Sequence, residues 1–421
     1  MSERILLCLA HMSGKEMDFI KEAFDQNWVV PLGPNVNGFE KDLEEFVNGR
    51  EGAAPLDKKV VALSAGTAAV HLALIACGVK AGDEVIVQSF TFCASSHPVT
   101  YLGATPVFVD SEKDTWNMDP ELLEEAIKDR IAKTGRKPKA IVPVALYGMP
   151  YNITKIMEIA NRYEIPVVED AAEGFGSRFN GQVLGTFGKY GVLSFNGNKM
   201  ITTSGGGALI CADDEAKKQI MWYATQARES YPYYQHEAIG YNYRMSNICA
   251  GIGRGQMTVV DEHITHHRHV QALYKELLKD VKGIILHEAP SPEYDSNYWL
   301  CTATLDSDLK IKGQDKAYAE VITGAVGGAA GVTHATKSAH TALEPNANVE
   351  AMRMFLDAAG IESRPLWKPM HCQPVYKDAP AYTNGVSESL FRVGICLPAG
   401  PWVTDDHVRY IVDKIKAAIE L

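Results

Sequence analysis

The stretch GVLSFNGNKMITTSGGG, residues 191–207, decides the fold. It opens with a short apolar run that ends in Ser194, and Lys199 follows among small residues. A similar run at residues 165–168 leads into Asp170. Such runs are apolar on both faces, which is typical of strands in a sheet that helices cover on both sides.

The same pattern recurs along the first half of the chain, with amphipathic stretches between the apolar runs. This alternation predicts an α/β layered domain over residues 40–255. The apolar runs are residues 59–63, 84–88, 105–109, 140–144, 165–168, 191–194 and 208–211, and the amphipathic stretches include residues 67–77, 120–134 and 153–163.

The pattern changes after residue 256 and predicts a smaller α+β domain. We therefore expect two domains, residues 1–255 and 256–421. Residues 322–340 are rich in Gly, Ala, Ser, Thr and His without a clear period, which predicts a long loop or insertion. The predicted elements of the second domain are a helix at 256–280, a strand at 299–305, and helices at 349–359 and 405–419.

Composition is that of an ordinary globular protein, with 46% hydrophobic and 22% charged residues. The net charge of −11 argues against nonspecific binding to nucleic acid. The short apolar run near the N-terminus is a poor signal peptide, so we expect a cytoplasmic protein without a membrane segment. The eight cysteines form no Cys-x-x-Cys pair and are expected to be free thiols.

The chemistry indicated by residues 191–207 is that of a Schiff-base lysine. An amine that reacts near neutral pH must be partly desolvated, and the glycines leave room for a flat ring beside Lys199. Asp170, at the end of the other strand, could keep a pyridine nitrogen protonated. Together they suggest pyridoxal phosphate (PLP), although a lone lysine in a glycine-rich loop is more often a solvated charge.

Three further motifs each permit two interpretations. Residues 64–69 are either a phosphate cradle at a helix N-terminus or a helix capped by Ser64. Phe92 either stacks on a cofactor ring or belongs to the core. Glu173 either reaches the ring hydroxyl or the amino group being transferred, or is an ion-pair partner or a charge at a helix N-terminus. Neither a GxGxxG nor a Walker A pattern is found, which argues against dinucleotide or nucleoside triphosphate binding.

Two loops and one histidine-rich run remain. Residues 240–247 and 363–371 concentrate Arg, Lys, Asn and aromatic residues, which suits a phosphorylated planar ligand or a domain interface. His263, His266, His267 and His269 lie at helical spacing beside charged residues, so we favour a solvated helix face over metal binding. We expect no metal site.

These segments together resemble the DegT/DnrJ/EryC1/StrS sugar aminotransferases, a branch of the fold-type I PLP enzymes. The resemblance runs from residues 27–33 to residues 394–400. Residues 194–199, 225–229 and 364–368 are similar to the bacterial transaminases that make UDP-N-acetylbacillosamine precursors. The resemblance implies a large domain with a mostly parallel seven-stranded sheet and a smaller C-terminal α+β domain.

It also implies residue roles. Lys199 would form the Schiff base and move the proton, Asp170 would pair with the ring nitrogen and Phe92 would stack on the ring. Glu173 would contact the cofactor, and Asn242 would reach the phosphate of a neighbouring subunit, making a homodimer the functional unit. The implied phosphate ligands are Ala65 or Gly66, Thr67 and Ser194, and the implied sugar-nucleotide cleft comprises Asn27, Trp28, Val29, Val30, Arg244, Arg364, Trp367, Lys368 and His371.

The implied reaction moves the amino group of L-glutamate to C4 of a UDP-linked 4-keto-6-deoxy-N-acetyl sugar. Many family members have Gln at the position of Glu173, whereas the bacillosamine-type enzymes have Glu. A GDP-linked keto sugar stays open as substrate. A sugar dehydratase of the family would have His in place of Lys199, and a non-catalytic regulator would not need Lys199, Asp170 and Ser194 together, so both are disfavoured.

Overall fold

The computed structural model describes residues 4–49, 52–318 and 343–420, and the predicted loop at 322–340 lies outside them. All seven strands predicted for the first half are present. The strands are β1 (Lys59–Leu63), β2 (Glu84–Gln88), β3 (Thr105–Val109), β4 (Ile141–Val142), β5 (Val168–Asp170), β8 (Tyr190–Ser194) and β9 (Gly207–Cys211).

These strands form one mixed sheet. Hydrogen bonding gives the orders β1-β9-β8-β5 and β14-β3-β2-β4, and bridges from Ile141 to Val167 and from Val144 to Asp170 join the two halves. Most neighbours are parallel, but β9 runs antiparallel to both β1 and β8. An eighth strand, β14 (Ala381–Tyr382), comes from the distant C-terminal part and pairs with β3.

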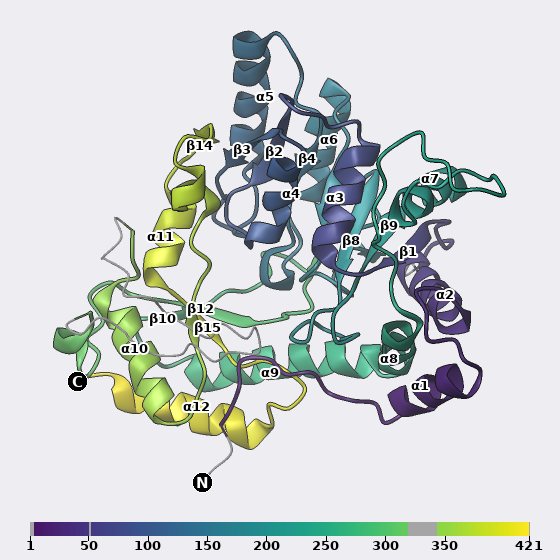
Figure 1. Cartoon of the computed structure of the whole chain (residues 1–421). Coiled ribbons are helices and arrows are strands. Elements are labelled where there is room, and N and C mark those ends of the chain that lie inside the picture. Colours follow the sequence, from purple (N-terminus) through teal and green to yellow (C-terminus); the bar gives the residue numbers. More distant parts are fainter. Residues whose placement is uncertain (1–3, 50–51, 319–342, 421) are drawn as a thin grey trace.

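Helices cover both faces of this sheet (Figure 1). Ile86 packs in the core on one face, whereas its neighbours Val85 and Val87 pack in the core on the other. Because side chains alternate between the two faces of a strand, successive residues of β2 pack into two different apolar cores. The surrounding helices are α2 (Pro34–Asn48), α3 (Gly66–Ala76), α4 (His97–Tyr101), α5 (Pro120–Thr134), α6 (Ile153–Tyr163) and α7 (Asp214–Ala224).

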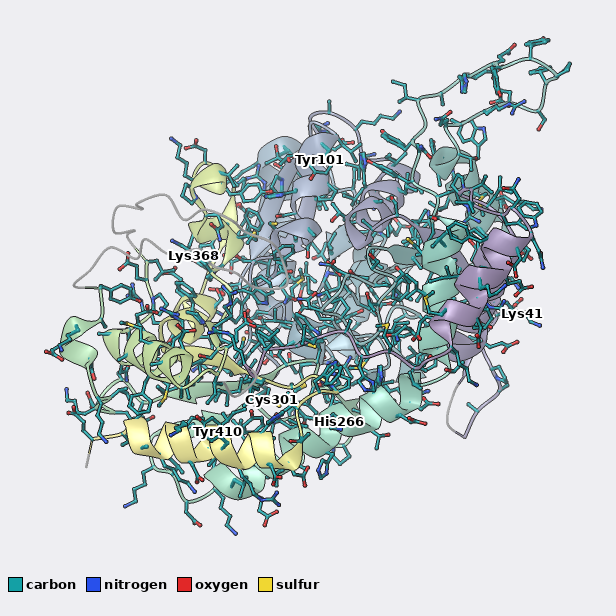
Figure 2. The ribbon with its side chains drawn as sticks, turned by 60° about the horizontal axis from the view of Figure 1, so that its bottom comes forward. Lys41, Tyr101, His266, Cys301, Lys368 and Tyr410 are labelled. Carbon is teal, nitrogen blue, oxygen red and sulfur yellow. The ribbon has the colours of Figure 1, made fainter. Side chains whose placement is uncertain are left out.

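The C-terminal part has its own antiparallel sheet, ordered β10-β12-β15-β13. Helices α9 and α12 run side by side next to it (Figure 1). Figure 2 labels Cys301 in this sheet and His266 on α9. The elements are α9 (Val260–Leu278), β10 (Ile284–Leu286), β12 (Cys301–Leu305), α10 (Ala347–Ala358), β13 (Arg364–Pro365), α11 (Val386–Val393), β15 (Gly394–Leu397) and α12 (Asp405–Ala418).

The prediction of one helix over residues 256–280 is wrong in detail. The chain forms α8 (Asn247–Met257) and then α9, with a break at Thr258 and Val259. The Thr258 hydroxyl donates to the carbonyl of Gly255 at 2.7 Å and closes the end of α8. The predicted strand at 299–305 begins only at Cys301, because the preceding residues form a turn.

Several segments connect the two parts. Helix α1 (Glu16–Asp25) packs on α8, and β11 (Tyr294–Asp295) pairs with β6 (Arg178–Phe179), which pairs with β7 (Gln182–Val183). We keep a division near residue 256 as a proposal. Among the described residues, no helix has the length and apolar character needed to cross a membrane. Short 3₁₀ turns occur at Cys93–Ser95, Leu146–Gly148, Gln314–Lys316, Met370–Cys372 and Pro374–Tyr376.

Candidate active site

A cavity of about 380 Å³ lies where the carboxyl ends of β5 and β8 meet the start of α3. Ligands in open α/β sheets bind at this edge. The cavity brings together residues that are far apart in sequence. Of the residues singled out from the sequence, Ala65, Gly66, Thr67, Phe92, Asp170, Glu173, Ser194, Lys199 and Trp367 line it.

The N-terminus of α3 forms one wall of this cavity. Its N-cap residue is Ala65, which has no side-chain hydrogen bond to the helix, so the alternative of a cap by Ser64 is wrong. The first N–H groups of α3 therefore lack a capping side chain, and the helix dipole favours an anion there. A Cβ on Gly66 would lie 3.1 Å from the Cβ of Ser194, so glycine permits this close approach. The arrangement fits a phosphate group.

Asp170 lies at the end of β5 and is buried. Its carboxylate accepts a hydrogen bond from the Ser95 hydroxyl at 2.6 Å and another from the Ala172 N–H at 3.1 Å. Burial raises the pKa of Asp170, while these two donors and the charge of Lys199 oppose the rise. A protonated ring nitrogen beside it would favour the charged carboxylate, which is the fit that pyridoxal phosphate requires.

Lys199 and Glu173 form a loose buried pair. The Nζ of Lys199 lies 3.5 Å from Oε1 of Glu173, and the other carboxylate oxygen accepts the N–H of Tyr147 at 2.7 Å. Burial raises the pKa of Glu173, and Lys199 and the Tyr147 N–H counteract this. The same ammonium lies 4.0 Å from the ring centroid of Trp299. The lysine thus has little solvent around it, as a Schiff-base amine requires.

Two aromatic side chains stand at the cavity mouth. Phe92 is about half exposed, and its ring centroid lies 4.9 Å from that of Trp367. The backbone N–H of Trp367 donates to the Tyr147 hydroxyl at 2.8 Å, which anchors the loop that carries it. Phe92 is not a core residue, and its free face is available to a flat ring.

The segment 27–30 lies elsewhere, between α1 and α2. Asn247 holds its backbone, because its side-chain amide donates to the carbonyl of Trp28 and its N–H donates to that of Val30, both at 2.9 Å. The side chains of Trp28, Val29 and Val30 are exposed. This segment and Asn27 do not line the cavity around Lys199.

Arg244 and Asn242 line a second, open groove. The guanidinium of Arg244 is buried and donates to Oε1 of Glu40 at 2.5 Å and to the carbonyl of Ala62 at 2.9 Å. Asn242 is exposed in the same groove. Within this single chain neither residue lines the cavity around Lys199.

Arg364 and Lys368 also lie outside the cavity lining. Arg364 donates to Oε1 of Glu362 at 2.9 Å, and Lys368 donates to the carbonyl of Leu343 at 3.1 Å. Of the loop at 364–371, only Trp367 lines the cavity.

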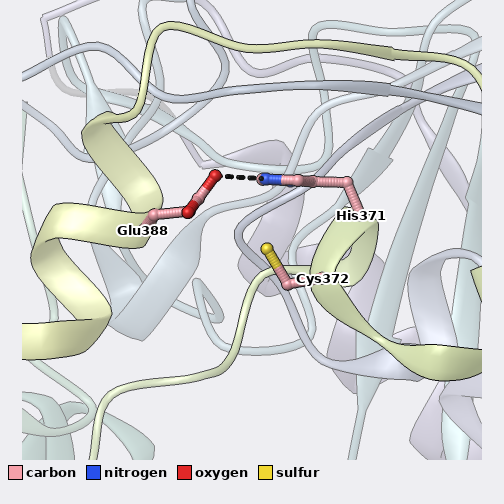
Figure 3. Close-up of side chains that lie close together, drawn as sticks. All are labelled: His371, Cys372 and Glu388. Atoms are coloured by element: carbon pink, nitrogen blue, oxygen red, sulfur yellow. Dashed lines mark hydrogen bonds and ion pairs between the residues drawn. The ribbon is translucent and has the colours of Figure 1, made fainter. Parts of the chain in front are cut away.

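His371 belongs to a chain of hydrogen bonds with Ser89 and Glu388. Its Nδ1 lies 2.6 Å from the Ser89 hydroxyl, and its Nε2 lies 3.2 Å from Oε1 of Glu388 (Figure 3). The ligand atoms of His371, Cys372 and Glu388 lie within 4.8 Å of one another. Burial raises the pKa of the Cys372 thiol to about 11. The imidazole already joins Ser89 to Glu388 through its two nitrogens, so we interpret the group as a support for the loop.

The histidines of α9 do not converge. Within the described residues their ring nitrogens bond to four different groups, which are the carbonyls of Met200, Val403 and Tyr298 and the carboxylate of Asp405. His263 and His267 are buried, so the expectation of a fully solvated face is wrong for these two. Burial lowers the pKa of His267 to about 3, and this imidazole therefore stays neutral.

Sequence reasoning missed four residues that shape the site: Ser95, Tyr147, Asn297 and Trp299. None of them lies in a motif that suggests chemistry. Tyr147 has a left-handed backbone, with φ of 54°, and Tyr298 has φ of 48°. Such strain in residues without glycine's freedom is visible only in the fold, and it often marks functional sites.

Comparison with known proteins identifies the family. The model of the DegT/DnrJ/EryC1/StrS aminotransferase family matches residues 11–317 and 323–416. The putative pyridoxal phosphate-dependent aminotransferase EpsN of Bacillus subtilis is 41% identical over 99% of this chain and 96% of its own length. The GDP-perosamine synthase of Escherichia coli O157:H7 is 32% identical over 96% of this chain and 95% of its own length.

Two solved structures are also similar. A DegT DnrJ EryC1 StrS aminotransferase from Brucella abortus has 27% identity and a TM-score of 0.79, covering 96% of this chain and 95% of its own. DesV of S. venezuelae, solved with a ketimine intermediate, has 26% identity and a TM-score of 0.79, covering 99% and 98%. The expected fold type I and the expected cofactor, pyridoxal phosphate, are thereby confirmed. This chain belongs to the DegT/DnrJ/EryC1/StrS aminotransferase family.

Proposed function

We propose that this chain transfers the amino group of L-glutamate to C4 of a UDP-linked 4-keto-6-deoxy-N-acetyl sugar. The observation that carries the transaminase part is the convergence of Lys199, Asp170 and the uncapped start of α3 on one cavity. The choice of sugar rests on the resemblance described above, including Glu173. A relative from Pseudomonas aeruginosa, 36% identical over 59% of this chain and 65% of its own length, is named for a UDP-linked keto sugar.

The residues divide the work of holding the cofactor. The N–H groups at the start of α3, together with Ser194, would bind the phosphate. Asp170 would face the ring nitrogen and Phe92 one face of the ring. When bound, pyridoxal phosphate supplies a ring that withdraws the electron pair of the bond broken at the amino-bearing carbon.

Lys199 would perform the proton transfers. In the first half-reaction its Nζ would take the proton from the α-carbon of glutamate and pass it to the cofactor, and in the second it would take a proton from the cofactor and deliver it to C4 of the sugar. Glu173 keeps the ammonium within the cavity at 3.5 Å and forms no tighter contact that would have to break. The buried surroundings exclude water and keep the lysine partly desolvated.

A homodimer is part of this proposal. The arm between α7 and α8 carries exposed Tyr231, Tyr233, Tyr234 and Ile239, an unusual concentration of apolar surface on a projecting segment. Tyr231, Tyr234, Asn242 and Arg244 line the same groove of about 800 Å³. A second copy that covered this arm would bring Asn242 near the neighbouring cofactor phosphate, as the resemblance implies.

A GDP-linked 4-keto-6-deoxymannose is the second candidate substrate. Relatives from three bacteria that are 29–32% identical to this chain are named GDP-perosamine synthase. The two substrates differ in the base and in the N-acetyl group. Both would be processed by the same Lys199 chemistry, so the cavity around that residue does not discriminate between them.

The deciding experiment is mass spectrometry of the product. Purified protein with PLP and L-glutamate receives the UDP-linked sugar or, separately, the GDP-linked sugar, with the Lys199→Ala variant as the control. A 4-amino product from the UDP sugar alone supports the proposal, and one from the GDP sugar alone replaces the substrate. Bound PLP without either product overturns both substrates and leaves the cofactor assignment standing.

A further inference from the structure

The turn between β11 and β12 brings Trp299 into the active-site cavity. Its side chain is only 2% exposed, although it comes from the C-terminal part of the chain. The Lys199 ammonium lies 4.0 Å from the centroid of the indole ring and 3.5 Å from Glu173. The ammonium is therefore in contact with both an aromatic face and a carboxylate.

Trp299 is held rigidly in this place. Its indole N–H donates to the carbonyl of Asn198 at 2.6 Å, and Asn198 is the residue directly before Lys199. Its backbone N–H donates to the side-chain oxygen of Asn297 at 2.8 Å. Tyr298, between them, adopts a left-handed backbone with φ of 48°, a strained conformation that aims Trp299 inward.

Asn297 also fixes the carboxylate side of the pair. It is fully buried, and its amide donates to the backbone carbonyls of Glu173 at 2.9 Å and of Phe175 at 3.0 Å. One side chain thus sets the positions of both Trp299 and Glu173. The approach is so close that a Cβ on Gly148 would lie 1.8 Å from the Asn297 side-chain oxygen.

The chemistry gives this arrangement a purpose. In a transaminase, the lysine is free for half of the cycle, while the transferred amino group occupies the cofactor. A free ammonium in a buried cavity is costly unless something stabilises it. An aromatic face stabilises a cation without taking its proton. The buried thiol of Cys8, whose pKa burial raises to about 12, also stays protonated beside this pair.

We propose that Trp299 is a positioning residue for Lys199. Its indole ring contacts and stabilises the free lysine ammonium between the two half-reactions. The inference deepens the proposed function and rests on the role assigned there to Lys199. It does not depend on the identity of the sugar. Asn297 is the support that holds both the ring and Glu173 near the amine.

The test measures the reactivity of Lys199 in the full-length protein loaded with pyridoxamine phosphate, which leaves the lysine free. Limited acetylation with acetic anhydride at several pH values is followed by peptide mass spectrometry, with exposed Lys21 as the internal reference. Trp299→Phe keeps an aromatic face and loses the indole N–H, whereas Trp299→Leu loses the face. Trp402→Leu is the matched control, because Trp402 also donates to a carbonyl, that of Ala10, but lies outside the cavity.

We expect acetylation of Lys199 to be about tenfold faster at neutral pH in Trp299→Leu, with its pH profile moved to lower pH, because loss of the ring destabilises the charged form. Trp299→Phe and Trp402→Leu should stay within about threefold of the wild type. If Trp299→Leu does not fold, Trp299→Met replaces it with the same expectation.

Two results would overturn the inference. One is an unchanged rate in Trp299→Leu, and the other is equal acceleration in the Phe and Leu variants, which would assign the effect to the hydrogen bond. Failure of the proposed function is read separately. The proposed function fails if the Lys199→Ala variant still transaminates. The acetylation experiment does not depend on that result, because it requires no turnover.

Discussion

Lys199 in the cavity and Arg244 in the groove are both buried cations paired with a glutamate, yet the two pairs differ sharply. The Arg244 guanidinium contacts Glu40 at 2.5 Å, and it also donates to the carbonyl of Ala62. The Lys199 ammonium lies 3.5 Å from Glu173, and no other hydrogen bond from it is seen to a described residue.

The difference shows how a structural ion pair can be told from a chemical one. The Glu40 carboxylate also accepts the N–H of Ala62 at the edge of β1, so the Arg244 pair locks the strand to α2. Lys199 retains donors that are not used, and its contact to the ring of Trp299 is non-directional. A loosely held cation can exchange partners at low cost, whereas one held by a short ion pair and a backbone carbonyl cannot.

The largest effect should be the loss of turnover on removing Lys199. In Lys199→Ala we expect turnover to fall by about 10³–10⁴-fold or more, because the proposed general base is lost. The fold should be retained, since burial raises the pKa of Glu173 and lets the unpaired carboxyl take a proton. Product formation and thermal unfolding are measured together.

Lys189→Ala serves as the matched control, because Lys189 is exposed and directly precedes β8. It should keep full activity. A Lys199→Ala protein that still turns over would contradict the assignment of Lys199 as the catalytic base.

Removing Arg244 should instead lower the stability of the fold. Arg244→Met removes the shorter of the two cation contacts to the buried Glu40 carboxylate and leaves Lys217 at 3.6 Å. We expect a loss of about 2–3 kcal/mol in the free energy of unfolding, because the carboxylate is then poorly compensated. Chemical denaturation measures it. The double variant with Glu40→Gln should recover much of the loss, because the poorly compensated charge is gone. Equal stability of Arg244→Met and wild type would show that this pair is not structural.

The third prediction concerns the pH dependence of stability on the Lys199 side of the comparison. His267 supports the turn that carries Trp299, the aromatic neighbour of Lys199. Its ring contacts the carbonyl of Tyr298 at 3.2 Å, and burial lowers its pKa from 6.5 to about 3. As the pH falls below 6.5, the unfolded chain binds a proton at this position that the native state does not, so stability falls.

For this one imidazole the loss between pH 7 and pH 5 should be about 2 kcal/mol. His267→Gln keeps a donor for Tyr298 and removes the titration. Its own loss between the two pH values should be smaller than that of the wild type by this amount. Identical pH dependence in urea denaturation of the two proteins would contradict this, because it would show that the native and unfolded imidazoles bind protons alike.

The smallest expected effect concerns Asp170. Ser95→Ala removes one neutral donor and leaves the Ala172 N–H, so the carboxylate is less stabilised in its charged form. We expect about fivefold weaker binding of pyridoxal phosphate, equivalent to about 1 kcal/mol. Thr91→Val, one hydrogen bond further from Asp170, should change affinity less. Spectroscopic titration of the cofactor distinguishes the two, and the reverse order would contradict this role of Ser95.

Much of the fold follows from local pattern. Residues 120–134 and 153–163 form helices with the predicted bounds, and each has an Asp or Asn cap that is visible in the sequence. The break between α8 and α9 was not predicted, because hydrophobic period continues through Thr258 while a side-chain hydrogen bond ends the helix. Strand β14 has only two residues, too few to give a signal.

The residues of the candidate site also fall into two groups, those that local pattern predicts and those that only the fold brings in. Lys199, Asp170, Ser194 and the start of α3 could be predicted, because each follows directly from a strand end or a helix start. Asn297 and Trp299 could not, since their role depends on contacts with Glu173 and Lys199, which lie far from them in the sequence.

The sequence by itself determined the seven main strands of the large sheet and several helices beside them, and it predicted the lysine–aspartate chemistry, because these depend on short-range periodicity and residue type. Only the tertiary structure decided which buried cation is free to react. Arg244 and Lys199 read alike in sequence as cations in polar loops. Their difference arises from the partners that the folded chain places around them: Glu40 and a backbone carbonyl for one, and Glu173 and an aromatic face for the other.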